Sequence, residues 1–406
     1  MQKLILVLNC GSSSIKFSII DTVKYSKILS GIIDAIGLHH TKAVWKIHNY
    51  MSDCVYSFNK IITHLEGLDF LFQEILFKYK EITSNIIGIG HRIVHGGNKI
   101  TTAVFLNKKN IKYIEEASCF APTHNPINLL GVSFCKKNFP SLSKYNVGVF
   151  DTVFHQTLPA ESFLYGIPYK FFYKNHIRRY GAHGISHQYI CNKVAQILNI
   201  PKNNLNIISC HLGNGCSIAA IKDGLSVDTS MGLTPLEGLI MGNRSGDIDP
   251  AIIFFMYKNL KLDIKSIEDI LINKSGLLGL NEITSDFREI TYNYYKNVKF
   301  KLSFDVFCHR LAKYIAGYST LMDGKLDAIT FTGGIGENSS LMRLITITKL
   351  SLLGVFIDQK KNINVKSNRI NFIHLENSIP IIVIPSKEEI EIAKETMHVI
   401  NTKCIV

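Results

Sequence analysis

The stretch LILVLNCGSSSIKFSII, residues 4–20, decides the fold because it predicts two short strands joined by a tight turn. Residues 4–8 are almost wholly apolar, which is typical of a strand buried on both faces. In the returning strand Ser14 and Lys16 share one face, and the apolar side chains share the other. A turn rich in backbone N–H groups and hydroxyls, followed by a lysine, is suited to hold a phosphate group.

The turn differs from a Walker loop. It lacks the GxxxxGK[ST] spacing of a Walker loop, and it leads into a strand rather than a helix. Taken alone, an ordinary Asn/Gly/Ser hairpin is the better interpretation. However, the stretch NIISCHLGNGCSIAAI, residues 206–221, repeats the same design, which indicates an internal duplication. Two such hairpins, one in each domain, are expected to hold one polyphosphate from both sides of a cleft.

The composition predicts a globular chain of two or three domains in the cytoplasm. Of its 406 residues, 46% are hydrophobic and 19% are charged, and no apolar run is long enough to cross a bilayer. The N-terminus lacks the pattern of a signal peptide. The net charge of +13 comes from scattered lysines, so we predict anionic substrates and neither a nucleic acid nor a membrane as a partner. The nine cysteines show no metal-binding spacing and are predicted to be free thiols.

The first half of the chain predicts a ligand site at the end of a parallel sheet. Arg92 follows a buried strand that is predicted to end at Gly90, and the carboxyl ends of such strands bind ligands in open α/β sheets. Asp151 directly follows another strand, in a position that commonly meets Mg²⁺. The predicted elements are short strands over 24–56, a helix over 58–79, strands over 86–89 and 145–150, and a helix that starts within 121–128.

The second half contains three glycine-rich segments with candidate functional residues. His183 lies between Ala182 and Gly184, where little bulk shields it, which favours a functional over a core role. Residues 231–250 form a long loop that contains Arg244, and long ordered loops are usually functional. The glycine turn in 331–339 offers bare backbone to the ring and sugar of a nucleotide. The predicted helices are 189–198, 250–258, 264–273, 304–322 and 388–399, and the predicted strands are 326–330 and 379–386.

Over essentially its whole length the chain resembles the acetokinase family, the acetate kinases, within the wider group of sugar kinases, actin and the Hsp70 ATPase domain. The motifs that carry the resemblance are NCGSSSIKF, GHRIVHGG, APTHNP, VFDTVFHQT, RRYGAHGISH, HLGNGCS, DTSMGLTPLEG, RSGDIDP and FTGGIGEN. The resemblance implies an α/β fold of two duplicated actin-like (ribonuclease H-like) domains with an ATP cleft between them. The implied domains are 1–150, joined by the C-terminal helix 388–406, and 151–387, with the nucleotide site and the interface of a homodimer.

The resemblance also implies the reaction, which is reversible phosphorylation of acetate by ATP to acetyl phosphate, with Mg²⁺, which Mn²⁺ can replace. The implied metal residues are Asn9 and Glu388, and the implied catalytic residues are Asp151, Arg92, Arg244 and His183, the last two as transition-state stabilisers. Arg92, Val94, Thr123, Ala182 and Pro235 are implied to bind the acyl substrate. The implied ATP-binding residues are Ser12, Ser14, Lys16, His211, Leu212, Gly213, Asn214, Gly215, Gly334, Ile335, Gly336, Glu337 and Asn338.

Three positions depart from the family pattern. Thr123 stands where Leu is usual, Ala182 where some members have Phe, and Lys387 where Asn is usual. The two pocket changes leave the acyl chain length open, so a kinase for propionate or another short-chain acid is the alternative. A different class of alternative is an actin-like or chaperone-like ATPase switch, which would use the same hairpins.

Elementary chemistry assigns Asp151 a role other than that of a base. A carboxylate substrate is already ionised at neutral pH, so phosphoryl transfer to it needs no general base. Asp151 is therefore expected to hold an arginine or a magnesium-bound water. Cys10 and Cys216 lie inside the two hairpins, where alkylation is expected to block the nucleotide unless both thiols are buried and inert.

Overall fold

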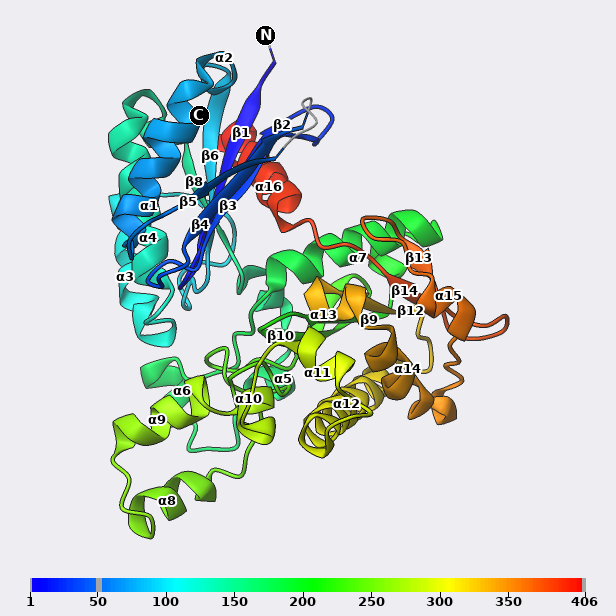
Figure 1. The fold of residues 1–406 in the computed structure, drawn as a ribbon. Coiled ribbons are helices and arrows are strands. Elements are labelled where there is room, and N and C mark those ends of the chain that lie inside the picture. Colours follow the sequence, from blue (N-terminus) through cyan, green and yellow to red (C-terminus); the bar gives the residue numbers. More distant parts are fainter. Residues whose placement is uncertain (1, 49–52, 404–406) are drawn as a thin grey trace. The chain divides into compact units, whose positions relative to one another are not determined.

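The computed structural model describes residues 2–48 and 53–403, and its contacts divide the chain into two compact units (Figure 1). The first unit comprises residues 1–153 and 387–406, and the second comprises residues 154–386. Asp151 groups with the first unit by its contacts, whereas the sequence predicts a domain boundary after residue 150. The assignment of the nucleotide site and the dimer interface to the second domain stays a prediction.

The first unit is built on an eight-stranded sheet with the order β5-β4-β3-β2-β1-β6-β8-β7. The predicted hairpin is confirmed, because β1 pairs antiparallel with β2. On its other side β1 runs parallel to β6, and β6 runs parallel to β8. The strands are β1 Leu4–Cys10, β2 Ile15–Asp21, β3 Lys27–Asp34, β4 Lys42–Ile47, β5 Cys54–Ser57, β6 Ile86–Ile93, β7 Val104–Phe105 and β8 Asn146–Phe150.

Helices cover both faces of this sheet (Figure 1). The C-terminal helix α16 packs on β1, β6 and β8. Gly88 and Gly90 on β6 permit this approach, because a Cβ at either position would collide with Ile400 or Thr396 of α16. Ile89 faces the opposite way, into the core under α1 and α4. The helices of this unit are α1 His64–Phe70, α2 Lys80–Thr83, α3 Lys108–Glu116, α4 Asn125–Asn138 and α16 Glu388–Lys403.

The helix predicted over 58–79 begins only at His64. Thr63 caps it in a capping box with Glu66, which fixes the start. After α1 the chain continues as a π turn over Leu71–Ile75 and a 3₁₀ turn. The helical period of residues 58–79 also predicts Ile61 and Leu65 on its apolar face, and this is wrong, since both side chains are about half exposed. Residue 61 precedes the helix, and the wider π turn changes the phase between Leu65 and the later apolar positions.

The second unit repeats the sheet of the first. Its order is β11-β10-β9-β12-β14-β13, in which the antiparallel hairpin β9-β10 is followed by the parallel strands β12 and β14. In both units an antiparallel strand forms the edge of the sheet next to the last parallel strand. This strand is β7 in the first unit and β13 in the second. The duplication is therefore confirmed. The strands are β9 Ile207–Leu212, β10 Cys216–Lys222, β11 Leu225–Thr229, β12 Ala328–Thr332, β13 Asn371–Phe372 and β14 Ile381–Val383.

The strand predicted over 379–386 is reduced to β14. Pro380 and Pro385 flank it, and neither can donate a backbone hydrogen bond to a neighbouring strand. Two helices begin earlier than predicted. The first is α7, which starts at Gly184, and the second is α12, which starts at Val298, where Asn297 accepts hydrogen bonds from two backbone N–H groups.

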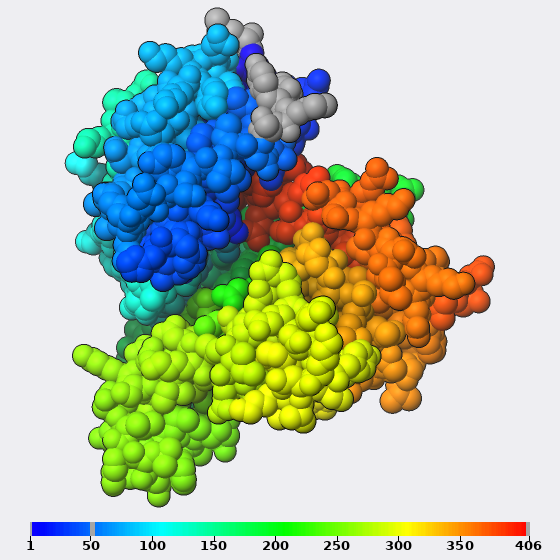
Figure 2. All heavy atoms as spheres, in the orientation of Figure 1, coloured from blue at the N-terminus to red at the C-terminus, as the bar shows by residue number. Residues whose placement is uncertain are grey.

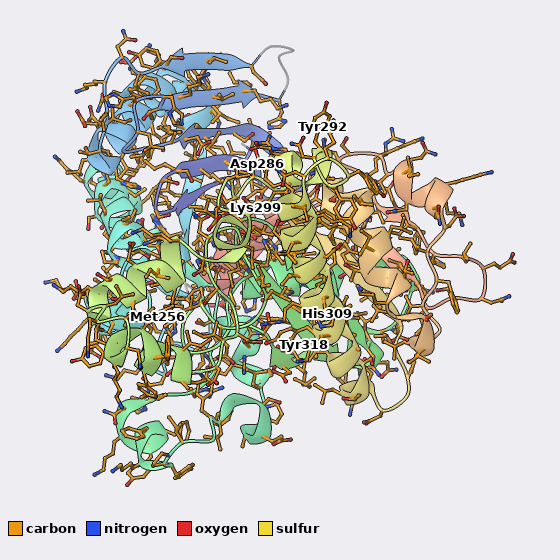
Figure 3. The ribbon with its side chains drawn as sticks, turned by 60° about the horizontal axis from the view of Figure 1, so that its bottom comes forward. Met256, Asp286, Tyr292, Lys299, His309 and Tyr318 are labelled. Atoms are coloured by element: carbon orange, nitrogen blue, oxygen red, sulfur yellow. The ribbon has the colours of Figure 1, made fainter. Side chains whose placement is uncertain are left out.

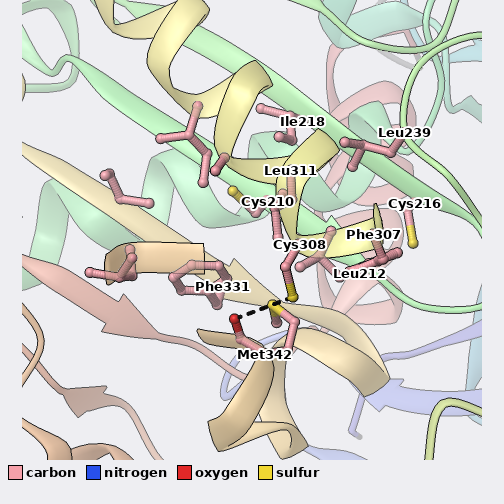
Figure 4. Close-up of a cluster of buried hydrophobic side chains, with 14 of the residues drawn as sticks. Cys210, Leu212, Cys216, Ile218, Leu239, Phe307, Cys308, Leu311, Phe331 and Met342 are labelled. Carbon is pink, nitrogen blue, oxygen red and sulfur yellow. Dashed lines mark hydrogen bonds between the residues drawn. The ribbon is translucent and has the colours of Figure 1, made fainter. Parts of the chain in front are cut away.

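The core of the second unit lies between its sheet and α12 (Figure 4). Phe307, Cys308 and Leu311 of α12 pack there against strand residues such as Cys210 and Phe331. Lys299, His309 and Tyr318 mark the length of α12 in Figure 3. The helices of this unit are α5 Ala160–Phe163, α6 Lys170–Asn175, α7 Gly184–Leu198, α8 Ala251–Lys258, α9 Ile264–Asn273, α10 Gly276–Asn281, α11 Phe287–Tyr292, α12 Val298–Ser319, α13 Gly333–Asn338, α14 Ser340–Thr348 and α15 Gln359–Ile363. Within the part of the chain that the structure describes, no helix has the length and apolar character needed to span a membrane.

Candidate active site

Arg92 and Asp151 meet at one edge of the first sheet. Arg92 lies on β6, which extends past the predicted end at Gly90, and Asp151 directly follows the parallel neighbour β8. The guanidinium binds the carboxylate in a fork, with Nε donating to Oδ1 at 3.0 Å and Nη2 donating to Oδ2 at 2.7 Å. On the opposite side, Glu388 Oε2 lies 3.6 Å from Arg92 Nη1. Asp151 thus holds an arginine, one of the two arrangements expected from the sequence.

These two carboxylates keep Arg92 charged. Burial by itself would lower the pKa of Arg92, but the charges of Asp151 and Glu388 raise this pKa above its ordinary range. The side chain of Asp151 is 2% exposed and that of Arg92 is 18% exposed. The fork is therefore ordered by the protein itself, and Nη1 is the edge of the guanidinium that Asp151 does not bind.

The first hairpin turn is tied to the rest of the unit through its backbone. Gly11 N donates to Ser14 O at 2.7 Å, and a ring nitrogen of His64 lies 2.9 Å from Gly11 O. Asn9 is partly buried at the end of β1, whereas Ser12 and Lys16 are exposed. The turn thus keeps a fixed backbone while its hydroxyl and ammonium groups face outward.

Two buried asparagines that we did not single out from the sequence connect the turn to β6. Asn128 Nδ2 donates to Cys10 O at 2.7 Å, and its Oδ1 accepts from Val94 N at 3.1 Å. Asn125 forms a similar pair of bonds with the backbone of His95. The predicted pocket residue Val94 is therefore fixed to the same asparagine as the hairpin. The available signal was the pair of asparagines at the start of a helix, in APTHNPIN.

In the second unit, His183 and Arg244 flank the other hairpin turn. Gly213 N donates to Gly215 O at 3.0 Å, which closes the turn between β9 and β10. A Cβ placed on Gly215 would lie 3.5 Å from His183 Nε2 and 3.7 Å from Arg244 Nη1. Bare backbone at this glycine therefore leaves room beside an imidazole and a guanidinium. This arrangement can hold an anion.

The histidines of this unit stack and are oriented by serines. The rings of His183 and His211 are stacked with centroids 4.3 Å apart, and Ser186 Oγ lies 2.8 Å from His211 Nδ1. His183 adopts a left-handed backbone at the start of α7 (φ 56°). Its neighbour Ala182 is buried in the core, so Phe at this position would overpack the core.

Within the part of the chain that the structure describes, the partners of Arg244 are neutral. Its Nη1 donates to Pro235 O at 3.0 Å and lies 3.7 Å from Met241 Sδ. No carboxylate among the described residues forms an ion pair with it, and burial lowers its pKa. Arg244 therefore presents a desolvated and uncompensated positive charge, which is suited to bind an anionic ligand.

The predicted nucleotide segment forms the short helix α13 directly after β12. Gly334 is exposed, and a Cβ placed on it would meet open space. Glu337 Oε1 accepts hydrogen bonds from Gly333 N and Ser386 N, both at 3.0 Å. Arg343, fully buried and not singled out from the sequence, supports the segment by donating to Gly336 O at 2.7 Å. A flat ligand group can lie against this bare backbone.

A model described as the acetokinase family matches residues 4–394 of the chain. This chain belongs to the acetokinase family. It is 51% identical over 402 residues to the acetate kinase of Buchnera aphidicola subsp. Schizaphis graminum, with 99% of each chain covered. It is 48% identical over 394 residues to the acetate kinase of Escherichia coli K12, which covers 97% of this chain and 98% of that one. The predicted family resemblance is thus confirmed.

Solved structures of acetokinase relatives have the same fold. A propionate kinase from Francisella tularensis superposes with a TM-score of 0.88 at 42% identity, covering 98% of this chain and 99% of that one. The acetate kinase of Porphyromonas gingivalis gives a TM-score of 0.87 at 35% identity, covering 98% of this chain and 100% of that one. The predicted α/β class with duplicated actin-like domains is confirmed by these matches and by the two equivalent sheets.

The metal residues implied by the acetokinase resemblance both lie in the first unit. Among the described residues, no group of three or more His, Cys, Asp or Glu side chains could hold a metal ion. Asn9 and Glu388 offer one amide oxygen and one carboxylate, and α16 packs on β1. Mg²⁺ typically takes one or two protein ligands together with phosphate oxygens and waters, so this donor set fits Mg²⁺.

The thiols in the two acetokinase hairpins are buried. Cys10 is 3% exposed and Cys216 is 0% exposed, and burial raises the pKa of each thiol to about 12. Cys216 packs in the core cluster of the second unit (Figure 4). Because the thiolate is the reactive form, the structure favours inert thiols over ready alkylation.

Proposed function

We propose that this protein transfers the γ-phosphoryl group of ATP to acetate, giving acetyl phosphate and ADP in a reversible reaction. The observation that carries the proposal is membership of the acetokinase family along nearly the whole chain. The site residues support it, because Arg92 and Arg244 are the groups that a reaction between two anions needs. A nucleotide switch that only hydrolyses ATP has no use for a second anion site.

Arg92 would bind the carboxylate of acetate and guide it toward the phosphoryl group. Its Nε and Nη2 edge is occupied by Asp151, so Nη1 is the edge available to the substrate. Asp151 keeps the guanidinium in place and has no proton to remove, since acetate is already ionised. Glu388 lies near the same edge and balances the charge until the substrate arrives.

Arg244 and His183 would stabilise the phosphoryl group during transfer. The equatorial oxygens carry the negative charge of the transition state, and preorganised donors in a desolvated site stabilise this charge most strongly. Arg244 supplies a partly buried positive charge that has no carboxylate partner among the described residues. His183 lies on the same side of Gly215 as Arg244 and can donate a hydrogen bond.

The two hairpins and α13 would bind ATP. Backbone N–H groups and side chains of the turns suit the phosphates, and the bare backbone at Gly334 suits the adenosine. Asn9 and Glu388 would hold Mg²⁺, which when bound neutralises phosphate oxygens, and Mn²⁺ can replace it. The proposed contacts are Ser12, Ser14, Lys16, His211, Leu212, Gly213, Asn214, Gly215, Gly334, Ile335, Gly336, Glu337 and Asn338.

The acyl pocket favours acetate without excluding propionate. Val94 and Pro235 supply apolar surface, whereas Thr123 is exposed and polar. An apolar pocket discriminates by about 1–3 kcal/mol per methylene group, so a longer acid is disfavoured but still accepted. The similar structure from Francisella tularensis bears the name of a propionate kinase, which keeps propionate as the second candidate substrate.

The protein would act as a homodimer in the cytoplasm. Helix α8 supports an interface between copies, because its apolar side chains are exposed and continue toward α9. In Figure 2 these yellow-green residues form one end of the second unit, and Figure 3 labels Met256 among them. The exposed side chains are Ile252, Phe254, Phe255, Tyr257, Leu260 and Ile264.

The test is a coupled assay of ADP release with acetate, propionate, butyrate and no carboxylate. Acetate is expected to give the highest kcat/KM, propionate a moderate loss and butyrate a large one. Turnover without any carboxylate at the rate seen with acetate would overturn the kinase assignment in favour of an ATPase. A higher kcat/KM for propionate than for acetate would overturn the choice of acetate.

A further inference from the structure

Four side chains form a continuous hydrogen-bonded chain that ends at His183. Ser209 Oγ on β9 lies 2.9 Å from His187 Nδ1, and His187 Nε2 lies 2.8 Å from Ser217 Oγ on β10. Ser217 Oγ also lies 3.0 Å from His183 Nδ1. Ser209, Ser217 and His187 are completely buried. None of these three residues was predicted from the sequence to have a role in the site.

Counting donors and acceptors fixes the direction of the hydrogen bonds between these four side chains. The Ser209 hydroxyl has His187 Nδ1 as its sole hydrogen-bond partner among the described residues. A hydroxyl carries one proton, and a buried O–H without an acceptor is costly, so Ser209 donates to Nδ1. Nδ1 of His187 is then an acceptor, and the neutral ring carries its proton on Nε2. Burial lowers the pKa of His187 well below its ordinary value, which is consistent with a neutral ring.

The hydrogen bonds continue in the same direction from His187 to His183. His187 Nε2–H donates to Ser217 Oγ, and Ser217 uses its single proton to donate to His183 Nδ1. With Nδ1 acting as an acceptor, the imidazole of His183 carries its proton on Nε2. Nε2 and the adjoining Cε1 are the ring atoms nearest to the Cβ position at Gly215, at 3.5 and 3.4 Å, and Arg244 Nη1 lies 3.7 Å from the same position.

We propose that His187 and Ser217 are positioning residues that hold His183 as the tautomer protonated on Nε2. The inference rests on the proposed function, in which His183 contacts the phosphoryl group. Phosphate oxygens are acceptors, so an Nε2–H attracts them, whereas an unprotonated Nε2 presents a lone pair that repels them. The relay therefore supplies a donor at this atom without requiring a charged imidazole.

A second pair in the same unit provides a matched control. Ser226 Oγ on β11 lies 2.8 Å from Nδ1 of His155, and both side chains are completely buried. Replacing Ser226 by Ala removes the same kind of buried serine–histidine bond as replacing Ser217. His155 contacts the carbonyl oxygen of Ala182 through Nε2, and its ring packs edge-on against that of His187 with centroids 5.6 Å apart, so its two ring nitrogens lie outside the hydrogen-bonded chain.

The kinetic test compares Ser217→Ala with Ser226→Ala. Ser217→Ala is expected to lower kcat roughly tenfold or more while KM for ATP changes less than about twofold. Ser226→Ala is expected to keep kcat within about twofold of the wild type. Equal losses of kcat in the two variants would mean that Ser217 has only a structural role, and the proposal would be overturned.

Substitutions at His187 extend the test if Ser217→Ala fails to fold. Gln places its amide near the position of Nε2 and can donate to Ser217, whereas Asn reaches only the position of Nδ1 near Ser209. His187→Gln is therefore expected to retain most of the activity that His187→Asn loses. Equal activity of these two variants contradicts the relay.

The tautomer itself is measured by ¹⁵N NMR on the ligand-free full-length protein labelled at histidine. The signals of His183 are identified by comparison with His183→Gln. In the wild type, His183 is expected to show a protonated Nε2 and an unprotonated Nδ1. In Ser217→Ala, His183 is expected to show a mixture of tautomers. A wild-type His183 protonated on Nδ1 alone overturns the proposal. This measurement does not depend on turnover, so a failure of the proposed acetate kinase activity would be seen separately.

Discussion

The two arginines of the candidate site differ in how the protein compensates their charge. Arg92, on a strand of the first unit, is held by Asp151 and lies near Glu388. Arg244, on a loop of the second unit, has a backbone carbonyl and a thioether as partners. The difference shows that Arg92 is neutralised and ordered before any ligand binds. Arg244 has no carboxylate partner among the described residues, so its charge is suited to an anionic ligand.

This contrast predicts different consequences for stability. Removing one partner of a buried ion pair leaves the other charge uncompensated, which typically costs about 3–5 kcal/mol. Arg92→Ala is therefore expected to lower the free energy of unfolding by about this amount, because Asp151 stays buried. Arg244→Ala is expected to leave it within about 1 kcal/mol of the wild type, since an uncompensated buried charge is removed.

Denaturant unfolding of both variants measures these effects, with Arg92→Ala/Asp151→Asn as the control. The double variant removes the orphaned carboxylate and is expected to recover part of the lost stability. If Arg244→Ala were the less stable of the two single variants, the comparison of the two arginines would be reversed.

The two units are also expected to differ in stability at acidic pH. Burial lowers the pKa of His91 in the first unit and of His155 in the second to about 4, and that of His187 well below the ordinary value. These histidines bind protons more readily in the unfolded chain than in the folded one. Their contribution to the free energy of unfolding is therefore present above about pH 6.5 and is lost as the pH falls toward 4. His91 and His155 each contribute on the order of 3 kcal/mol at most.

Because the second unit contains two of these histidines and the first contains one, the second unit is expected to open first as the pH falls. Hydrogen exchange followed by mass spectrometry between pH 7 and pH 4.5 resolves the two units. Earlier loss of protection in β6 and β8 than in β9 and β10 would contradict this expectation.

Thr123 and Ala182, one in each unit, are two positions at which the proposed acyl specificity can be tested. Thr123 is exposed, so Thr123→Leu can add apolar surface without strain, and it is expected to increase the preference for acetate over butyrate by about 1 kcal/mol. Ala182 is buried, so Ala182→Phe is expected to lower stability instead. The measurements are kcat/KM for three acids and the melting temperature. An unchanged melting temperature in Ala182→Phe would show that the pocket has free volume there.

The smallest effect is expected from alkylation. Cys119 is exposed, whereas Cys10 and Cys216 are buried with raised pKa values of about 12. Iodoacetamide at pH 7.5 (~1 mM, a concentration that reacts with the thiolate form) is therefore expected to modify Cys119 and to leave activity unchanged. Mass spectrometry identifies the modified residues. Inactivation that follows modification of Cys216 would restore the alkylation hypothesis for the second hairpin.

Elements with a clear hydrophobic period could be predicted from the sequence, and pairings across the chain could not. Residues 4–20 and 206–221 are dense in apolar residues and turn residues, so both hairpins and their duplication were visible. Asp151 was expected to hold an arginine, and the structure shows that it holds Arg92 because the parallel strands β6 and β8 end at the same sheet edge. The continuation of β6 to Ile93 was not, since Gly90 suggested an end.

The supporting polar groups of the site gave no periodic signal. Asn128 joins Cys10 to Val94, and Ser217 joins His187 to His183. These contacts link residues far apart in the chain, and each depends on the fold that brings the partners together. A buried serine or asparagine has the same appearance in a sequence as an exposed one.

The turnover of Arg244→Met tests the central claim most directly, because Met keeps apolar volume and removes only the charge and its donors. The account predicts that kcat falls by about a hundredfold or more, roughly 3 kcal/mol of transition-state stabilisation, while the free energy of unfolding stays equal or rises. Near-normal turnover in a stably folded Arg244→Met would contradict the claim that this uncompensated charge serves the transferred phosphoryl group.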